Sequence, residues 1–246
     1  MRRLGAGPTD PPFDTNPLLD TADTLFPVYV LADASVRYAR RDPARATRYR
    51  EAAQRGGEFS WRTYGRRASF VAGDYVPSVD KEASLFALRA YLALAEAADA
   101  AGAARPASMS PSEAGAAAAL WEGRASDAAL FVDTFHYQVN LPLAMDRPRT
   151  APYSWARDWA RDWYEGQTTV GLGFIELGHS GVDTTAAEFV PELLRLYERT
   201  KEAARLNQGL IQLFNTKQPL DVSGRKGYFE RGFMPELWLF AVQAYR

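Results

Sequence analysis

Residues 79–101, VDKEASLFALRAYLALAEAADAA, decide the fold class of this chain. Alanine, leucine, lysine and glutamate are strong helix formers, and the stretch contains neither glycine nor proline. Ser78 stands directly before it, as a residue type that often caps the start of a helix. We therefore predict a long helix over about 79–101.

Further helices are expected on both sides of this one. Ser110, Pro111 and Glu113 form a capping box, which begins a helix expected to run to about Leu141. Pro43 suits the first position of another helix. Alternating apolar residues, which indicate strands, are almost absent. We therefore predict an all-α protein, an irregular helical bundle with long loops, whose other helices cover about 20–38, 43–54, 154–165, 185–214 and 233–245.

The N-terminal segment and the loops determine the expected domain organisation. Residues 1–18 are rich in proline and poor in apolar side chains, so we expect a flexible N-terminal arm there. Residues 56–77 contain Gly56 and Gly57 and are expected to form loop or short strand. No boundary is strong enough to divide the remainder, and we expect a single helical domain over 19–246.

The composition excludes several classes of function. The 246 residues carry 29 basic and 30 acidic side chains. With a net charge near zero, we expect no electrostatic binding of the whole protein to nucleic acid or to an anionic membrane. The absence of cysteine excludes disulfides, cysteine-bound metals and thiol nucleophiles. No apolar stretch follows Arg2 and Arg3, as a signal peptide would require, and we expect a cytoplasmic protein.

The chain has two histidines, and each follows an acidic residue by three positions: Asp133 and His136, then Glu176 and His179. Residues three apart share a face of a helix, so each pair can bind a metal ion. Helical di-iron and di-manganese proteins combine two such pairs with two further carboxylates. In this di-metal hypothesis the further carboxylates come from Glu82 or Glu96 and from Glu198 or Glu202. Alternatively, His136 is a core histidine held by hydrogen bonds.

Tryptophans recur every four residues at Trp155, Trp159 and Trp163, which places them in one stripe on a helix. The stripe can pack in the core, with ion pairs on the opposite face. Alternatively, it forms an aromatic wall for a flat ligand or cofactor, in which Trp159 and Trp163 bind the cofactor.

A second cluster is basic. Six arginines lie within fourteen residues, and a guanidinium can hold both oxygens of a carboxylate or phosphate. The alternative is a solvated surface. The six are Arg37, Arg40, Arg41, Arg45, Arg48 and Arg50.

The C-terminal stretch 223–238, SGRKGYFERGFMPELW, resembles the end of the tryptophan 2,3-dioxygenases, a family of haem-dependent aromatic oxygenases with relatives in secondary metabolism. Residues 166–171, GQTTVG, are similar to a second segment of such a relative. The resemblance implies a helical, haem-dependent oxygenase acting on a small aromatic, amino-acid-like substrate. It assigns substrate binding to Ser223, Gly224 and Tyr228. In the oxygenase hypothesis, Ser223 and Arg225 hold a substrate carboxylate.

The haem ligand is where this sequence departs from that family. The family's axial histidine lies on the helix before the substrate loop, but residues 204–210 here read ARLNQGL. Two consequences are open: haem or iron is bound by His179 or His136 in a rearranged site, or the scaffold has lost haem and has another function. We expect His179, because Gly178 and Gly181 would let a flat macrocycle approach the backbone.

Three functional hypotheses follow. The first is an oxidoreductase, a haem- or iron-dependent oxygenase with a small aromatic substrate. The second is a non-haem di-metal oxygenase that uses Asp133, His136, Glu176 and His179. The third is a non-catalytic helical binding or assembly protein, in which the histidines are structural and the tryptophans are core or interface anchors. An exposed tryptophan stripe would favour a homodimer.

Overall fold

The computed structural model describes residues 21–63, 65, 71–72, 78–79, 81–103, 111–136, 181–183, 189–215, 237–239 and 244–245. This part of the chain is predominantly helical, so the predicted all-α class is confirmed. None of its helices is both long enough and apolar enough to cross a membrane. The N-terminal arm 1–18 and the helix over 154–165 lie outside the described residues.

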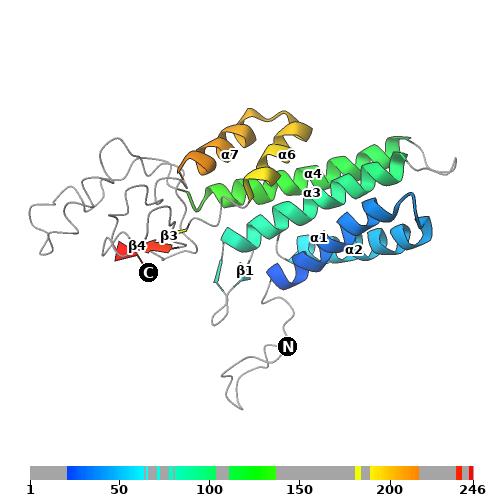
Figure 1. Cartoon of the computed structure of the whole chain (residues 1–246), viewed down its shortest axis with the longest axis horizontal. Helices are drawn as coiled ribbons and strands as arrows, with labels where there is room; N and C mark the ends of the chain where they lie inside the picture. The colour runs from blue at the N-terminus through cyan, green and yellow to red at the C-terminus, as the bar shows by residue number, and fades with distance from the viewer. Residues whose placement is uncertain are drawn as a thin grey trace, which may run out of the picture. The chain divides into compact units, whose positions relative to one another are not determined.

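The chain divides into two compact units, and the prediction of one helical domain over 19–246 stays a prediction. The first unit comprises Met1–Val132 with Glu198–Lys201. Helices α1 to α3 lie side by side in it (Figure 1). Its elements are α1 (Thr21–Tyr38), α2 (Pro43–Thr63), the antiparallel strands β1 (Val71–Ala72) and β2 (Ser78–Val79), α3 (Lys81–Ala103) and α4 (Pro111–Asp133), whose last residue belongs to the second unit.

The starts of these helices were predicted better than their ends. Helix α2 begins at Pro43, as expected, and the Arg45 amide donates to the Asp42 Oδ1 at 2.9 Å, which makes Asp42 the N-cap. Helix α4 begins at Pro111. It ends at Asp133, however, so the prediction that this helix continues to about Leu141 is wrong.

Helix α2 continues through Gly56 and Gly57, where the sequence predicted a loop. A Cβ at Gly56 would lie 2.6 Å from Val28 Cγ2 of α1, and one at Gly57 would lie 2.5 Å from Leu94 Cδ1 of α3. These glycines therefore serve close helix packing rather than chain reversal. The cost of glycine in a helix is offset by the contacts that the close approach permits.

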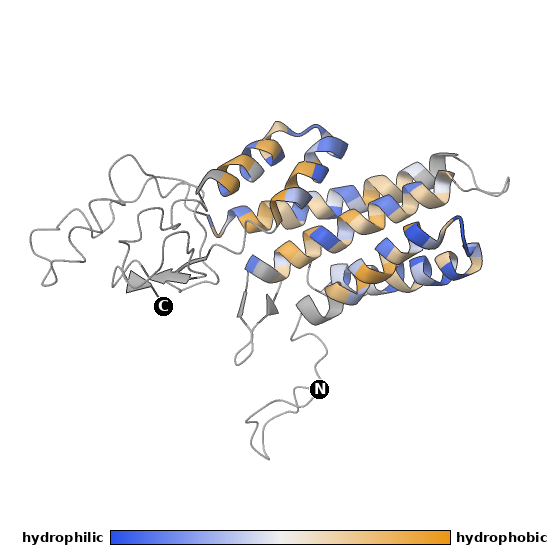
Figure 2. Ribbon diagram, viewed as in Figure 1, coloured by the Kyte–Doolittle hydropathy of each residue, from blue (hydrophilic) through white to orange (hydrophobic). Residues whose placement is uncertain are grey.

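Helix α3 is the centre of the first unit. Leu85, Leu88 and Leu92 have no exposed surface, and Figure 2 shows apolar colouring along much of the helix. Tyr91 stacks on Trp121 of α4 with ring centroids 5.7 Å apart, and its hydroxyl lies 3.1 Å from Ser60 Oγ of α2. Burial raises the pKa of Tyr91 well above its ordinary value, so this hydroxyl stays neutral and bonds to Ser60.

An arginine completes this core from α4. Arg124 donates from Nη1 and Nη2 to Glu58 Oε1 and Oε2, at 2.6 and 3.2 Å. Its guanidinium carbon lies 4.4 Å from the ring centroid of Trp121 and 5.2 Å from that of Trp61. The charge is therefore stabilised both by a two-pronged ion pair and by two aromatic faces.

The second unit comprises Asp133–Tyr197 with Glu202–Arg246. A Cβ at Gly209 would lie 3.5 Å from the Leu193 Cβ, which shows that two of its helices pack closely. The expected helix over 233–245 is wrong at 237–239 and 244–245, which are extended and pair antiparallel. The elements are β3 (Gly181–Asp183), α6 (Val190–Thr200), whose last three residues belong to the first unit, α7 (Ala203–Asn215), β4 (Leu237–Leu239) and β5 (Ala244–Tyr245), with strand order β3-β4-β5.

The predicted single helix over 185–214 is in fact two helices, α6 and α7. The break falls at Lys201, whose φ of 59° is left-handed. A left-handed residue ends a helix and is normally glycine, because a Cβ is strained there. Lysine carries no sequence signal for such a conformation, so the break was not predictable from residue type.

The first prediction compares two glycines. We expect Gly57→Ala to lower the free energy of unfolding by about 1–3 kcal/mol, because its Cβ would lie 2.5 Å from the Leu94 Cδ1 and 2.8 Å from the Trp121 ring. Gly123→Ala on α4 is the matched control, since a Cβ there meets nothing within 4 Å. It should raise stability by about 0.5–1 kcal/mol in urea unfolding. Equal effects of the two substitutions would contradict the packing role of Gly57.

The second prediction concerns the left-handed residue. Lys201→Gly should be more stable than Lys201→Ala by about 1 kcal/mol, because both remove the long side chain and only glycine relieves the strain. Thermal or urea unfolding of the two variants measures the difference. If the alanine variant is as stable as the glycine variant, Lys201 is not strained.

Candidate functional site

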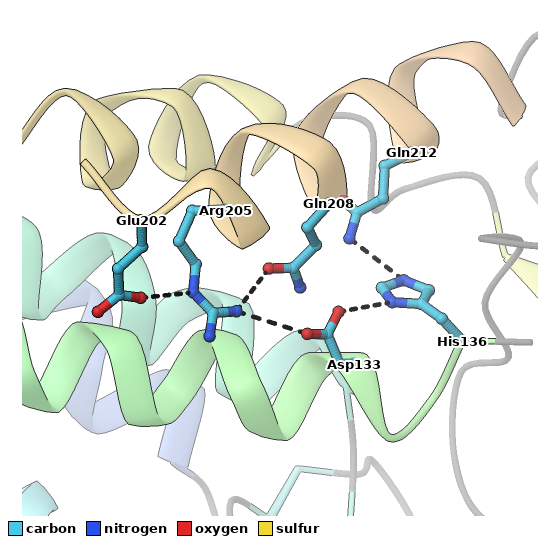
Figure 3. A network of polar contacts seen from close by, with 6 residues as sticks. All are labelled: Asp133, His136, Glu202, Arg205, Gln208 and Gln212. Carbon is cyan, nitrogen blue, oxygen red and sulfur yellow. Dashed lines mark hydrogen bonds and ion pairs between the residues drawn. The ribbon is translucent and has the colours of Figure 1, made fainter. Parts of the chain in front are cut away.

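The second unit contains a network of polar side chains around Arg205 and His136 (Figure 3). Helix α7 supplies Arg205, Gln208 and Gln212, whose spacing of three and four residues places them on one face. All three are buried. Asp133, the last residue of α4, and His136 face them. The network therefore joins the turn after α4 to one face of α7.

Arg205 is the centre of the network. Its Nη1 donates to Gln208 Oε1 at 3.0 Å and lies 3.4 Å from Asp133 Oδ2. Its Nε lies 3.4 Å from Glu202 Oε2. Arg205 is 3% exposed, and burying a cation is costly unless it is paired and hydrogen-bonded. Two carboxylates and one amide meet that requirement here.

His136 is held from three sides. Its backbone N–H donates to the Asp133 carbonyl at 3.1 Å, which turns the chain and brings the ring beside the Asp133 side chain. The ring Nδ1 lies 3.7 Å from Asp133 Oδ1, and the ring Nε2 lies 3.3 Å from Gln212 Nε2. The residue is 7% exposed. Both ring nitrogens thus face groups of the protein.

The partners define the chemistry of the ring. The tautomer of the ring decides which atom donates in the contact between Gln212 and the His136 Nε2. When the ring proton is on Nδ1, it faces the Asp133 carboxylate, and Nε2 accepts from the Gln212 amide. The contacts on both sides orient the imidazole.

The structure brings together one of the two predicted acid–histidine pairs. Asp133 and His136 are neighbours, but the second oxygen of Asp133 faces Arg205, and Glu202, one of the further carboxylates, also faces Arg205. Within the described ranges, no group of three or more histidine, aspartate or glutamate side chains is placed to hold a metal ion. The predicted haem, iron and di-metal sites stay predictions.

Most of the other predicted site residues fall outside the described part of the chain. The structure therefore does not bear on their roles. They are the metal ligands His179 and Glu176, the cofactor-binding Trp159 and Trp163, and the substrate-binding Ser223, Gly224, Arg225 and Tyr228.

The sequence did not single out the partners that α7 provides. Arg205 and Gln208 lie in the segment 204–210, whose lack of histidine separates it from the dioxygenase family. The signal for a polar face was the recurrence of long polar residues at 205, 208 and 212, which share one side of the helix. That spacing predicts a buried polar face, although it does not identify His136 as the partner.

Compared with family models, curated proteins and solved structures, the chain matches none of them. Its function must therefore be argued from the chemistry of its own residues.

The third prediction tests the contact between His136 and Gln212. In a double-mutant cycle with alanine at both positions, we expect a coupling of about 0.5–1.5 kcal/mol in the free energy of unfolding, because each group satisfies the other in a buried place. Asn207, exposed on the same helix, gives the control cycle. Its coupling to His136 should be below about 0.5 kcal/mol. Equal couplings in the two cycles would contradict a specific contact.

Proposed function

We propose that this protein is a non-catalytic helical binding protein in which His136 is a structural residue. The observation that carries the proposal is that both ring nitrogens of His136 face groups of the chain, Asp133 on one side and Gln212 on the other. A metal ligand or a general base needs an available lone pair, and the Gln212 amide nitrogen lies 3.3 Å from the His136 Nε2.

The charge next to the histidine supports the same proposal. The Arg205 guanidinium lies 3.4 Å from Asp133 Oδ2, on the carboxylate that the di-metal hypothesis would use. A metal ion at this carboxylate would be repelled by the arginine at short range. For a metal ion to bind, Arg205 would have to break its ion pairs with Asp133 and Glu202. The buried guanidinium would then lack a carboxylate partner, which is strongly destabilising.

The binding part of the proposal rests on the first unit. A cavity of about 340 Å³ lies where α1 ends, α2 begins and α3 ends. Its volume falls at the small end of the range for small-molecule sites. Its lining combines small apolar side chains with a few polar groups, as such sites do.

The fourth prediction concerns metal and colour. Protein produced with added iron and a haem precursor should show no Soret band near about 400 nm and much less than one metal ion per chain. His136→Ala should lower stability without changing the absorption spectrum or the metal content, because the ring acts through Asp133 and Gln212. Absorption spectra and elemental analysis give both readouts.

Two results would overturn the proposal, and each favours a different enzyme. A Soret band that His179→Ala abolishes would support the haem-dependent oxygenase. Colourless protein with about two iron or manganese ions per chain, lost in His136→Ala, would support the di-metal oxygenase. Both variants must retain helical circular dichroism for these comparisons.

A further inference from the structure

The cavity in the first unit is lined by residues from the end of α1, the start of α2 and the last turns of α3. Figure 1 shows these helix ends and the connection between α1 and α2. Alanines supply most of its lining, and their side chains are too short to fill the space between the helices. Polar groups come from Ser35, Thr47 and Arg50. The alanines are Ala39 after α1, Ala44 and Ala46 on α2, and Ala97, Ala100 and Ala101 on α3.

The polar groups of the cavity differ in whether they already have partners. Ser35 Oγ donates to the Ala32 carbonyl at 2.7 Å, which uses its hydrogen. Arg50 and Thr47 have no side-chain partner among the described residues. No acidic side chain is among the residues that line the cavity. The hydrogen-bonding groups left without a protein partner are therefore the Arg50 guanidinium, a cation that only donates, and the Thr47 hydroxyl, which can donate.

The surrounding charge has the same sign. Figure 2 shows the connection between α1 and α2 in the blue of hydrophilic residues. Two arginines on the flanking helices are paired locally: Arg37 of α1 with Asp33 at 2.6 Å, and Arg45 of α2 with Asp42 at 3.2 Å. Within the described part of the chain, no ion pair is found for Arg40, Arg41, Arg48 or Arg50.

We propose that this cavity binds a small organic anion, whose carboxylate or phosphate is held by Arg50 and whose compact apolar part lies among the alanines. The inference names the ligand class for the proposed binding function and rests on that function. It also gives a role to the arginine cluster, for which the sequence left anion binding and a solvated surface as alternatives.

The geometry of α2 suits an oxyanion. Thr47 and Arg50 are three residues apart, so both lie on the face of α2 that lines the cavity. The Arg50 guanidinium can donate to two oxygens at once, and the Thr47 hydroxyl can donate to a third or to the same group. The cavity also lies by the first turn of α2, whose dipole favours negative charge. Arg40 and Arg41, exposed and without an ion pair among the described residues, would raise the local concentration of anions.

The fifth prediction is tested by calorimetric titration of the full chain with benzoate and with phenyl phosphate. Benzyl alcohol is the uncharged probe of similar size. We expect at least one anion to bind with a Kd below about 1 mM, and benzyl alcohol to bind at least about tenfold more weakly. Binding of benzoate alone, or of phenyl phosphate alone, supports the proposal and identifies the acidic group.

Three substitutions locate the site. Arg50→Gln should weaken anion binding about 10- to 100-fold, because it removes a charged donor from the cavity. Arg48→Gln is the matched control: it removes the same charge from an exposed position on α2 outside the lining, and it should change the Kd less than about threefold. Ala100→Leu should abolish binding by filling the space. Circular dichroism checks folding, and Thr47→Val replaces Arg50→Gln if that variant does not fold.

Several outcomes would overturn the inference. They are no binding of either anion at about 10 mM to folded protein, equal binding of benzyl alcohol, equal losses in Arg48→Gln and Arg50→Gln, or inorganic phosphate binding as tightly as phenyl phosphate. These failures are distinct from failure of the proposed function, because a Soret band or bound metal is measured without any added anion. A colourless, metal-free protein that binds no anion would keep the structural role of His136 and discard only the ligand class.

Discussion

The close approach of α2 to its neighbours at Gly57 is the constraint on which the first unit depends. Without a Cβ there, the Leu94 and Trp121 side chains reach the α2 backbone, and Trp121 can stack on Tyr91. Trp121 in turn forms one face of the site that holds the Arg124 guanidinium. The absence of a Cβ at Gly57 thus permits an apolar contact, an aromatic stack and the cation–π contact of Arg124. Because the three share Trp121, a change at one of them is expected to alter the others.

The second unit also contains a buried arginine, which polar groups stabilise. Its buried cation, Arg205, has no aromatic contact in the described residues and is stabilised by Asp133, Glu202 and Gln208. Partners within the chain offset the cost of burying these polar groups, because an unpartnered buried polar group costs more than an apolar one. Asp133 contacts both Arg205 and His136, so one carboxylate links the two residues.

The sequence predicted the parts of the fold that local chemistry determines. The Pro43 and Pro111 starts, and the extent of α3, follow from capping residues and from helix propensity. Gly57 and Lys201 were misjudged for opposite reasons: glycine in a helix needs a tertiary neighbour to explain it, and a left-handed lysine carries no local signal. Likewise, the weighed alternative of a hydrogen-bonded His136 agrees with the contacts seen, but Gln212 is 76 residues away and could not be named as its partner.

The arginines of this chain separate into structural and binding candidates by what surrounds their charge. Arg124 and Arg205 are buried, and each guanidinium is already paired with at least one carboxylate of the chain. A ligand could gain little from either, since it would first have to displace those groups. Arg50 is half-buried beside an empty space lined by alanines, and its donors meet no carboxylate among the described residues. An incoming oxyanion would displace only water there, so the free energy of a charged hydrogen bond would appear in binding rather than in folding.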